Sequence, residues 1–199
     1  MLSLKKLLGW SMLVLAVAIT AVAYHTGTFL TEESTQAVRQ RSPLWRLPRF
    51  LTAPADETLL MPVQGVSVRR MTDTWLAPRP GGRQHKGQDI FAPRGTPVRS
   101  ATEGIVTHVG ENDLGGKVVF ILGAGGRTYY YAHLDRHEED LNAGDLVTTD
   151  TVIGYIGNTG NARTTAPHLH FAIFGTDGAI NPLPLLRDRK VGAKGREET

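Results

Sequence analysis

Short hydrophobic runs separated by glycine-rich segments constrain the fold of this chain more than any other feature. Between Met61 and Leu186, runs rich in valine, isoleucine, tyrosine and phenylalanine recur: GIVTHV, KVVFIL, TYYYAHL, TVIGYIG and HLHFAIF. Short strands at regular intervals, joined by glycine-rich turns, are typical of β-sandwiches and barrels. The GAGGR segment between the second and third runs predicts a hairpin. We therefore expect residues 61–186 to form one all-β domain built on an antiparallel sheet.

The N-terminal segment has a different character. Residues 7–24, LLGWSMLVLAVAITAVAY, carry no charge, and a helix of this length spans about 27 Å, close to the hydrocarbon thickness of a bilayer. Lys5 and Lys6 precede the run, which predicts that residues 1–6 stay in the cytoplasm. We expect one N-terminal transmembrane helix in the inner (cytoplasmic) membrane, single-pass, with the following domain facing the periplasm and cell wall. Residues 21–23, Ala-Val-Ala, also fit a cleavage site, so a removed signal peptide is the alternative.

Two further segments flank the β-rich region. Residues 25–60 contain Pro43, Pro48 and Pro54, which interrupt helices, and they are interpreted as a spacer. Residues 187–199, RDRKVGAKGREET, are charged and lack apolar anchors, so we expect a disordered tail.

Composition narrows the chemistry that this chain can perform. The chain has no cysteine, which excludes disulfides, thiolate zinc sites and a cysteine nucleophile. Any bound metal must be held by histidine, aspartate or glutamate. The net charge of +3 is mild and no dense Lys/Arg stripe occurs, so we do not expect nucleic acid as a partner.

Histidines occur where strands are expected. His168 and His170 lie one residue apart in APHLHFAIF, and alternate residues of a strand point to the same face. His85 and Asp89 occur in GRQHKGQDI, where neighbouring glycines and a proline argue against a helix. In an extended segment these two residues also share a face, so their side chains can converge.

A further histidine, His133, ends the run YYYAH. Alternation along a strand predicts that Tyr129, Tyr131 and His133 share one face, with Tyr130 and Leu134 on the other.

Two metal sites are compatible with these spacings. His85, Asp89, His168 and His170 could form a closed structural zinc site with four protein ligands. Alternatively, His85, Asp89 and one member of the pair bind zinc. The other member then stands with His133 beside a water at an open position. Spacing alone does not separate these two arrangements.

Three motifs taken together resemble a known family. HKGQDIFAPRGTPV, YYYAHL and GNTGNARTTAPHLHF are similar to the M23 metallopeptidases, the lysostaphin and LytM family of peptidoglycan endopeptidases. The similarity covers residues 61–186. It implies a lysostaphin-like fold of antiparallel sheets with barrel-sandwich hybrid character. It also implies that zinc is held by the first histidine and aspartate and by the second histidine of the pair, here His85, Asp89 and His170. His133 and His168 would flank the catalytic water.

The resemblance implies a zinc-dependent endopeptidase that cleaves peptide bonds of cell-wall peptidoglycan. One departure is Ala172, which stands where the family often has an acidic residue. The alternative is a catalytically silent wall-binding or regulatory module that activates another hydrolase. Loss of ligand residues would favour that alternative, and none of the five positions is lost. A lipoyl-type carrier domain is disfavoured, because it needs a lysine at an exposed hairpin tip and Lys117 begins an apolar strand.

Overall fold

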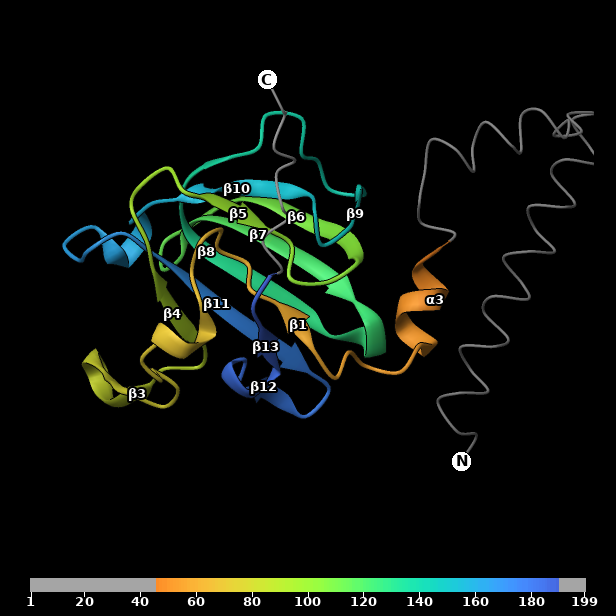
Figure 1. The fold of residues 1–199 in the computed structure, drawn as a ribbon, viewed down its shortest axis with the longest axis horizontal. Helices are drawn as coiled ribbons and strands as arrows, with labels where there is room; N and C mark the ends of the chain where they lie inside the picture. The colour runs from red at the N-terminus through yellow and green to blue at the C-terminus, as the bar shows by residue number, and fades with distance from the viewer. Residues whose placement is uncertain (1–45, 190–199) are drawn as a thin grey trace, which may run out of the picture. The chain divides into compact units, whose positions relative to one another are not determined.

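One antiparallel sheet dominates the structure, as the sequence predicts (Figure 1). The computed structural model describes residues 46–189. The main path of its nine-stranded sheet runs in the order β12-β11-β8-β7-β6-β9, while β4 pairs with β11, and β10 pairs with both β8 and β5. Every pair in this sheet is antiparallel. The bounds of its strands are β4 Gln88–Phe91, β5 Pro97–Arg99, β6 Gly104–Asn112, β7 Gly116–Gly123, β8 Thr128–His137, β9 Leu146–Val147, β10 Val152–Ile156, β11 His168–Gly175 and β12 Gly178–Ile180.

All five hydrophobic runs form strands, and the predicted hairpin is confirmed. β7 and β8 pair across the short 3₁₀ turn η4, Ala124–Gly126, in which Gly125 has a φ of 68°. That left-handed conformation explains the need for glycine at this turn. One face of the sheet supplies the core, where Val119, Ile121, Tyr129 and Phe171 are fully buried. Because side chains alternate between the two faces, a functional site on these strands must lie on the face opposite this core.

The long strand β8 changes its partner at His133. Residues up to Ala132 pair with β11, whereas residues from Leu134 onward pair with β10. On the β7 side the register shifts: Val119 lies opposite Tyr131 but Lys117 lies opposite Leu134, so β8 carries one extra residue. His133 itself has a φ of 65°. The sheet thus forks at a β-bulge that contains His133.

This bulge corrects one prediction made from the sequence. Regular alternation places His133 on the face of Tyr129 and Tyr131, but Leu134 joins those tyrosines in the core instead. His133 lies with Tyr130 on the opposite, groove-forming side. The extra residue in the bulge shifts the alternation by one position, which a pattern of period two cannot anticipate.

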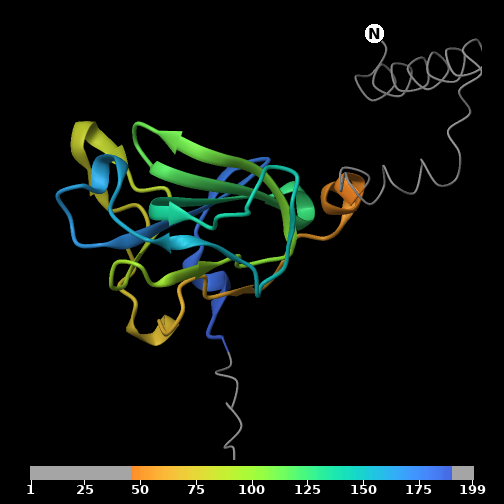
Figure 2. The same cartoon turned by 90° about the horizontal axis from the view of Figure 1, so that it is seen from above.

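Shorter elements border the sheet. They are the helix α3 Leu47–Thr52, the strands β1 Leu59–Leu60, β2 Pro78–Arg79, β3 Arg83–Gln84 and β13 Leu186–Arg187, and the 3₁₀ turns η2 Val68–Arg70, η3 Pro80–Gly82, η5 Gly160–Ala162 and η6 Leu183–Leu185. The β2–β3 hairpin and the loop that contains η5 lie at the same end of the sheet in two perpendicular views (Figures 1 and 2).

The flanks of the predicted domain are partly structured. Within the expected spacer, α3 begins with Pro48 in its first turn, where a proline is tolerated, and it buries Phe50. Leu59 is buried, and β1 pairs in parallel with β13. This pair is the one parallel contact among the strands of residues 46–189, where only antiparallel pairing was expected.

The first residues of the expected disordered tail are ordered. Arg187 pairs with Leu60 in the β1–β13 ladder, and Asp188 accepts hydrogen bonds from Ser67 and from the backbone N–H of Val68. Backbone pairing and charged hydrogen bonds replace the apolar anchors that this segment lacks. The predicted transmembrane helix of residues 7–24 and the rest of the tail lie outside the described residues. Within residues 46–189 there is no helix with the length and hydrophobicity of a membrane span.

Candidate metal centre

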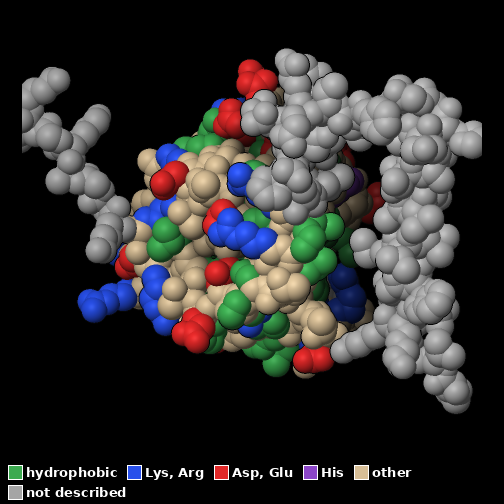
Figure 3. Space-filling model, turned by 90° about the vertical axis from the view of Figure 1, so that its right-hand side faces the viewer, with side chains coloured by type: hydrophobic (Ala, Val, Ile, Leu, Met, Phe, Trp, Pro, Cys, Tyr) green, Lys and Arg blue, Asp and Glu red, His purple; other side chains and the backbone are tan. Residues whose placement is uncertain are grey.

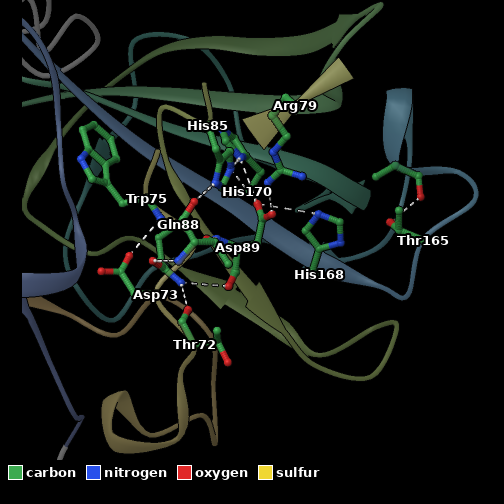
Figure 4. A network of polar contacts seen from close by, with 12 residues as sticks. Thr72, Asp73, Trp75, Arg79, His85, Gln88, Asp89, Thr165, His168 and His170 are labelled. Carbon is green, nitrogen blue, oxygen red and sulfur yellow. Dashed lines mark hydrogen bonds and ion pairs between the residues drawn. The ribbon is translucent and has the colours of Figure 1, made fainter. Parts of the chain in front are cut away.

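Three side chains converge at one point on the groove side of the sheet (Figure 4). The Nε2 atom of His85 lies 2.8 Å from Nδ1 of His170 and 3.0 Å from Oδ1 of Asp89. The Nδ1 atom of His170 lies 3.1 Å from the same carboxylate oxygen. Ligands at about 2.0–2.2 Å from a tetrahedral zinc ion lie roughly 3.3 Å from one another. The spacing and chemistry of these three atoms therefore fit zinc.

Strand pairing brings two of these residues together. Asp89 on β4 lies directly opposite His170 on β11, and side chains of directly opposed residues share a face. His85 follows β3 and lies in a loop, so the expected convergence with Asp89 occurs without a regular strand between them. The site is thus formed by a loop and two neighbouring strands.

Thr74 links the two upstream residues of the cluster. Its carbonyl oxygen accepts a hydrogen bond from Nδ1 of His85 at 2.6 Å, and its hydroxyl accepts one from the backbone N–H of Asp89 at 2.9 Å. A carbonyl can only accept, so Nδ1 of His85 carries the proton and Nε2 presents a lone pair to the cluster. Such outer hydrogen bonds orient the ligands of metal sites.

A buried glutamine holds this Thr74 segment in place. Gln88 is fully buried, and its amide nitrogen donates to the carbonyl of Thr72 at 2.6 Å while its amide oxygen accepts from the N–H of Thr74. Gln88 alternates with Asp89 along β4, so it points away from the metal cluster and toward the 72–74 segment.

The remaining two histidines stand beside the cluster. The ring centroids of His133 and His168 are 5.1 Å apart, and Nε2 of His168 lies 3.9 Å from Oδ1 of Asp89. Nδ1 of His133 donates to the carbonyl of Thr159 at 2.9 Å, and Nδ1 of His168 donates to that of Ala166 at 2.8 Å. A carbonyl can only accept, so in the neutral tautomer that each contact favours the lone pair lies on Nε2. The structure brings all five predicted residues together, and only three of them form the tight cluster.

Burial and mutual contacts set the charge states of the site. Burial alone would raise the pKa of Asp89, but the close polar contacts with His170, His85 and Arg79 outweigh this effect and hold the pKa well below its ordinary range. Burial lowers the pKa of His170 despite its contact with Asp89. Burial, together with the neighbouring His168 and His170, lowers the pKa of His133 to about 4. The carboxylate is ionised and His133 is neutral at physiological pH.

The five residues line a groove of about 940 Å³. One wall comes from the β2–β3 hairpin and the residues after it, and the other comes from the loop that contains η5. The other residues that line it are Arg79, Arg83, Gln84, Lys86, Leu114, Gly115, Tyr130, Ala132, Asn161, Ala162, Thr164 and Thr165. The three-residue cluster lines this groove, so a metal held there would be accessible from it, as catalytic zinc sites require.

Several residues of the site have no signal in the sequence. Thr74 and Thr159 act through carbonyls in loops, and Arg79 contacts a carboxylate oxygen of Asp89 from ten positions upstream. Gly87 packs against the His170 ring, where a side chain would collide. The sequence shows a glycine at position 87, but the reason for it is a contact with the His170 ring on β11, which the local sequence does not indicate.

Ala172 lies close to the candidate metal centre in the sheet. It is buried on β11 opposite Tyr130, whose ring lies 5.9 Å from that of His170. Directly opposed residues share a face, so Ala172 is on the groove side together with Tyr130.

Comparisons with known proteins agree with this geometry. Residues 83–182 match the model of peptidase family M23. The chain is 39% identical over 134 residues to the DD-carboxypeptidase/endopeptidase Mpg of Neisseria meningitidis serogroup B, which covers 67% of this chain and 28% of that protein. The chain spans only 28–36% of the length of the first curated relatives that it matches.

Two solved structures share the fold. The catalytic domain of the antimicrobial peptidase lysostaphin from Staphylococcus simulans is 29% identical, with a TM-score of 0.51 over 59% of this chain and 92% of that one. A zinc-containing peptidase from Vibrio cholerae is 28% identical, with a TM-score of 0.53 over 64% of this chain and 39% of that one. The predicted lysostaphin-like antiparallel fold is confirmed at this level.

Proposed function

Because this chain belongs to peptidase family M23, we propose that it is a zinc-dependent endopeptidase that hydrolyses peptide bonds of cell-wall peptidoglycan. One observation carries the proposal: a cluster of two imidazoles and a carboxylate at the floor of a groove, with two further histidines beside it. Endopeptidase relatives and a zinc-containing structural neighbour support it. No ligand position is missing, so nothing favours a silent wall-binding module.

His85, Asp89 and His170 would hold the metal through Nε2, a carboxylate oxygen and Nδ1. Bound zinc supplies Lewis-acid chemistry, polarising a carbonyl and lowering the pKa of a water toward 7. The ionised state of Asp89 and the fixed proton on Nδ1 of His85 prepare both for this role.

His133 and His168 would move the protons. Each ring donates from Nδ1 to a fixed carbonyl, so each Nε2 is free to accept a proton from the attacking water and return it to the leaving amine. Once protonated, Nε2 of either ring can also donate to the oxygen that becomes negative during attack. The lowered pKa of His133 keeps it in the base form at neutral pH.

Digestion of isolated peptidoglycan by the purified protein tests this function. Soluble muropeptides should appear with the wild type, and the fragments should identify a broken peptide bond. His133→Ala and a chelator should each abolish release, whereas His108→Ala, a change outside the groove-lining residues, should not. Binding of peptidoglycan without any released fragment would instead support the silent module.

We also propose that the domain is held at the inner membrane. This proposal rests on the sequence of residues 1–24 alone, with Lys5 and Lys6 before an uncharged run. Fractionation of cells that express the chain with a C-terminal tag should recover it in the membrane fraction. A shortened soluble product that begins near Tyr24 would establish the cleaved signal peptide instead.

A further inference from the structure

Positive side chains gather on one wall of the groove. Arg79, Arg83 and Lys86 all line it, from the β2–β3 hairpin and the residues that follow. Among the described residues that line the groove, Asp89 is the sole acid, and it belongs to the metal cluster. A cleft lined by one sign of charge concentrates ligands of the opposite sign.

Arg79 connects this wall to the catalytic cluster. Its guanidinium contacts Oδ2 of Asp89, while its side chain remains 38% exposed. A guanidinium carries five N–H donors in a planar fork, and contact with a single carboxylate oxygen uses only part of them. Arg79 therefore places positive charge at the boundary between the metal cluster and the open groove (Figure 4).

Lys86 and Arg83 extend the positive wall outward. Both side chains are exposed and line the groove, and the Lys86 ammonium lies 5.9 Å from the centre of the Trp75 ring. The opposite wall offers Asn161, Thr164 and Thr165, which are neutral hydrogen-bonding groups.

The face of the molecule drawn in Figure 3 does not show this bias. On the face drawn in Figure 3, positive and negative side chains are intermixed over the coloured part of the surface. The groove and this face therefore differ in how their charged side chains are distributed.

We propose that the groove selects a peptide that bears a free carboxylate next to the scissile bond, such as an acidic peptidoglycan stem, over an uncharged peptide such as a glycine cross-bridge. The position of this carboxylate beside a cleaved bond rests on the proposed function, whereas the preference of the groove for binding a carboxylate does not. The carboxylate pairs with Lys86 and Arg83, and the substrate backbone bonds to the neutral wall.

A pair of matched peptides tests this preference. One is a synthetic stem peptide with a free glutamate α-carboxyl, and the other is the same peptide with that group as a carboxamide. Turnover is measured with the full chain, and binding is measured by calorimetry in a His168→Ala background, which keeps the peptide intact. The test variant is Arg83→Gln/Lys86→Gln, and the matched control is Arg187→Gln, which removes a charge from β13 outside the groove-lining residues.

The wild type should prefer the carboxylate peptide by about tenfold in both kcat/KM and Kd, since two partly exposed ion pairs contribute on that order. The double variant should lose this preference, because its values for the carboxylate peptide should fall to those for the carboxamide peptide, and Arg187→Gln should keep it. Equal binding of both peptides by the wild type, or an unchanged ratio in the double variant, would refute the inference even if both peptides are cleaved. Carboxylate-selective binding without cleavage would uphold it and refute the proposed peptidase instead.

Discussion

At the scale of single residues, His168 and His170 face different partners although both lie on β11. Nδ1 of His170 contacts both His85 and Asp89, whereas Nδ1 of His168 is bonded to a backbone carbonyl. His170→Ala should therefore lose both zinc and activity. His168→Ala should keep zinc and lose hydrolysis by roughly 10²–10⁴-fold, as expected for a positioned acid–base group.

The measurement needs metal analysis and turnover on the same preparations, because a misfolded variant loses both. A closed four-ligand site makes the opposite prediction. If the two substitutions reduce zinc content equally, His168 is a ligand and the assignment of two roles is wrong.

Gly87 is expected to be as sensitive as a ligand. A Cβ at this position would lie 2.6 Å from Cε1 of His170 and 2.8 Å from the carbonyl oxygen of Phe171, both shorter than real contacts. Gly87→Ala should push the His170 ring out of the cluster and weaken zinc binding by about tenfold or more.

Gly175→Ala is the matched control for this substitution. It adds the same methyl group on β11, where the nearest neighbour is the flexible end of Ile180 at 3.1 Å. Equal zinc affinity in the wild type and Gly87→Ala, measured by competition with a chelating dye, would show that the site relaxes around the methyl group.

The charge state of His133 predicts a pH effect on stability. Its pKa falls to about 4 in the folded protein, because burial and two neighbouring histidines disfavour the cation, against an ordinary value near 6.5. Between these pH values the unfolded chain binds a proton at this residue that the folded protein does not. The free energy of unfolding should therefore decrease as the pH falls from 6.5 to 4.

Urea unfolding of the metal-free protein across this pH range measures the effect. His133→Gln removes the titrating group, so its stability should decline less steeply with acid than that of the wild type. Parallel curves would mean that His133 titrates normally.

At the scale of elements, the period-two pattern predicted strands but not their irregularities. All five runs became strands, and His168 and His170 share a face as expected. The pattern was wrong for β8, because the fork at His133 requires an extra residue and a left-handed backbone. Backbone strain of this kind costs of order 1–3 kcal/mol and is common at functional sites.

The period-two pattern also did not predict how the loops orient the histidines. Thr159 holds His133 through its carbonyl, while its hydroxyl donates to the carbonyl of Leu134 and accepts from the N–H of Lys117. These bonds join distant segments, and no local periodicity encodes them. The chemistry-bearing residues were predictable from motif spacing, but their supports depend on tertiary contacts.

Thr159→Val tests the loop as a positioning element. Loss of the hydroxyl removes two bonds that fix the carbonyl beneath His133, so kcat should fall about tenfold while zinc content stays constant. Thr159→Ser keeps both bonds and should restore the rate. A Val variant that loses zinc in proportion to its activity would indicate general disruption rather than positioning of His133.

At the scale of the whole molecule, a segment near the start of the described residues, β1, pairs with a segment at their end, β13. Arg189 donates to the carbonyls of Met61 and Ser100. The sequence pattern did not predict the pairing of β1 with β13, because strands of two residues have no detectable period. The boundary between domain and flank depends on such pairings rather than on composition.

The metal should also stabilise the whole fold, because its ligands join two distant segments of the chain. His85 and Asp89 are separated from His170 by more than 80 positions. A ligand that binds only the folded state adds about 4 kcal/mol at a thousandfold excess over Kd. For a domain of this size that gain raises Tm by roughly 10 °C.

Chelation should remove the increase in the wild type, and added zinc should restore it. His85→Ala should melt at the same temperature with and without chelator, whereas His108→Ala should respond as the wild type does. A wild-type Tm that is indifferent to chelation while zinc leaves the protein would show that the three side chains are held in place by the sheet alone.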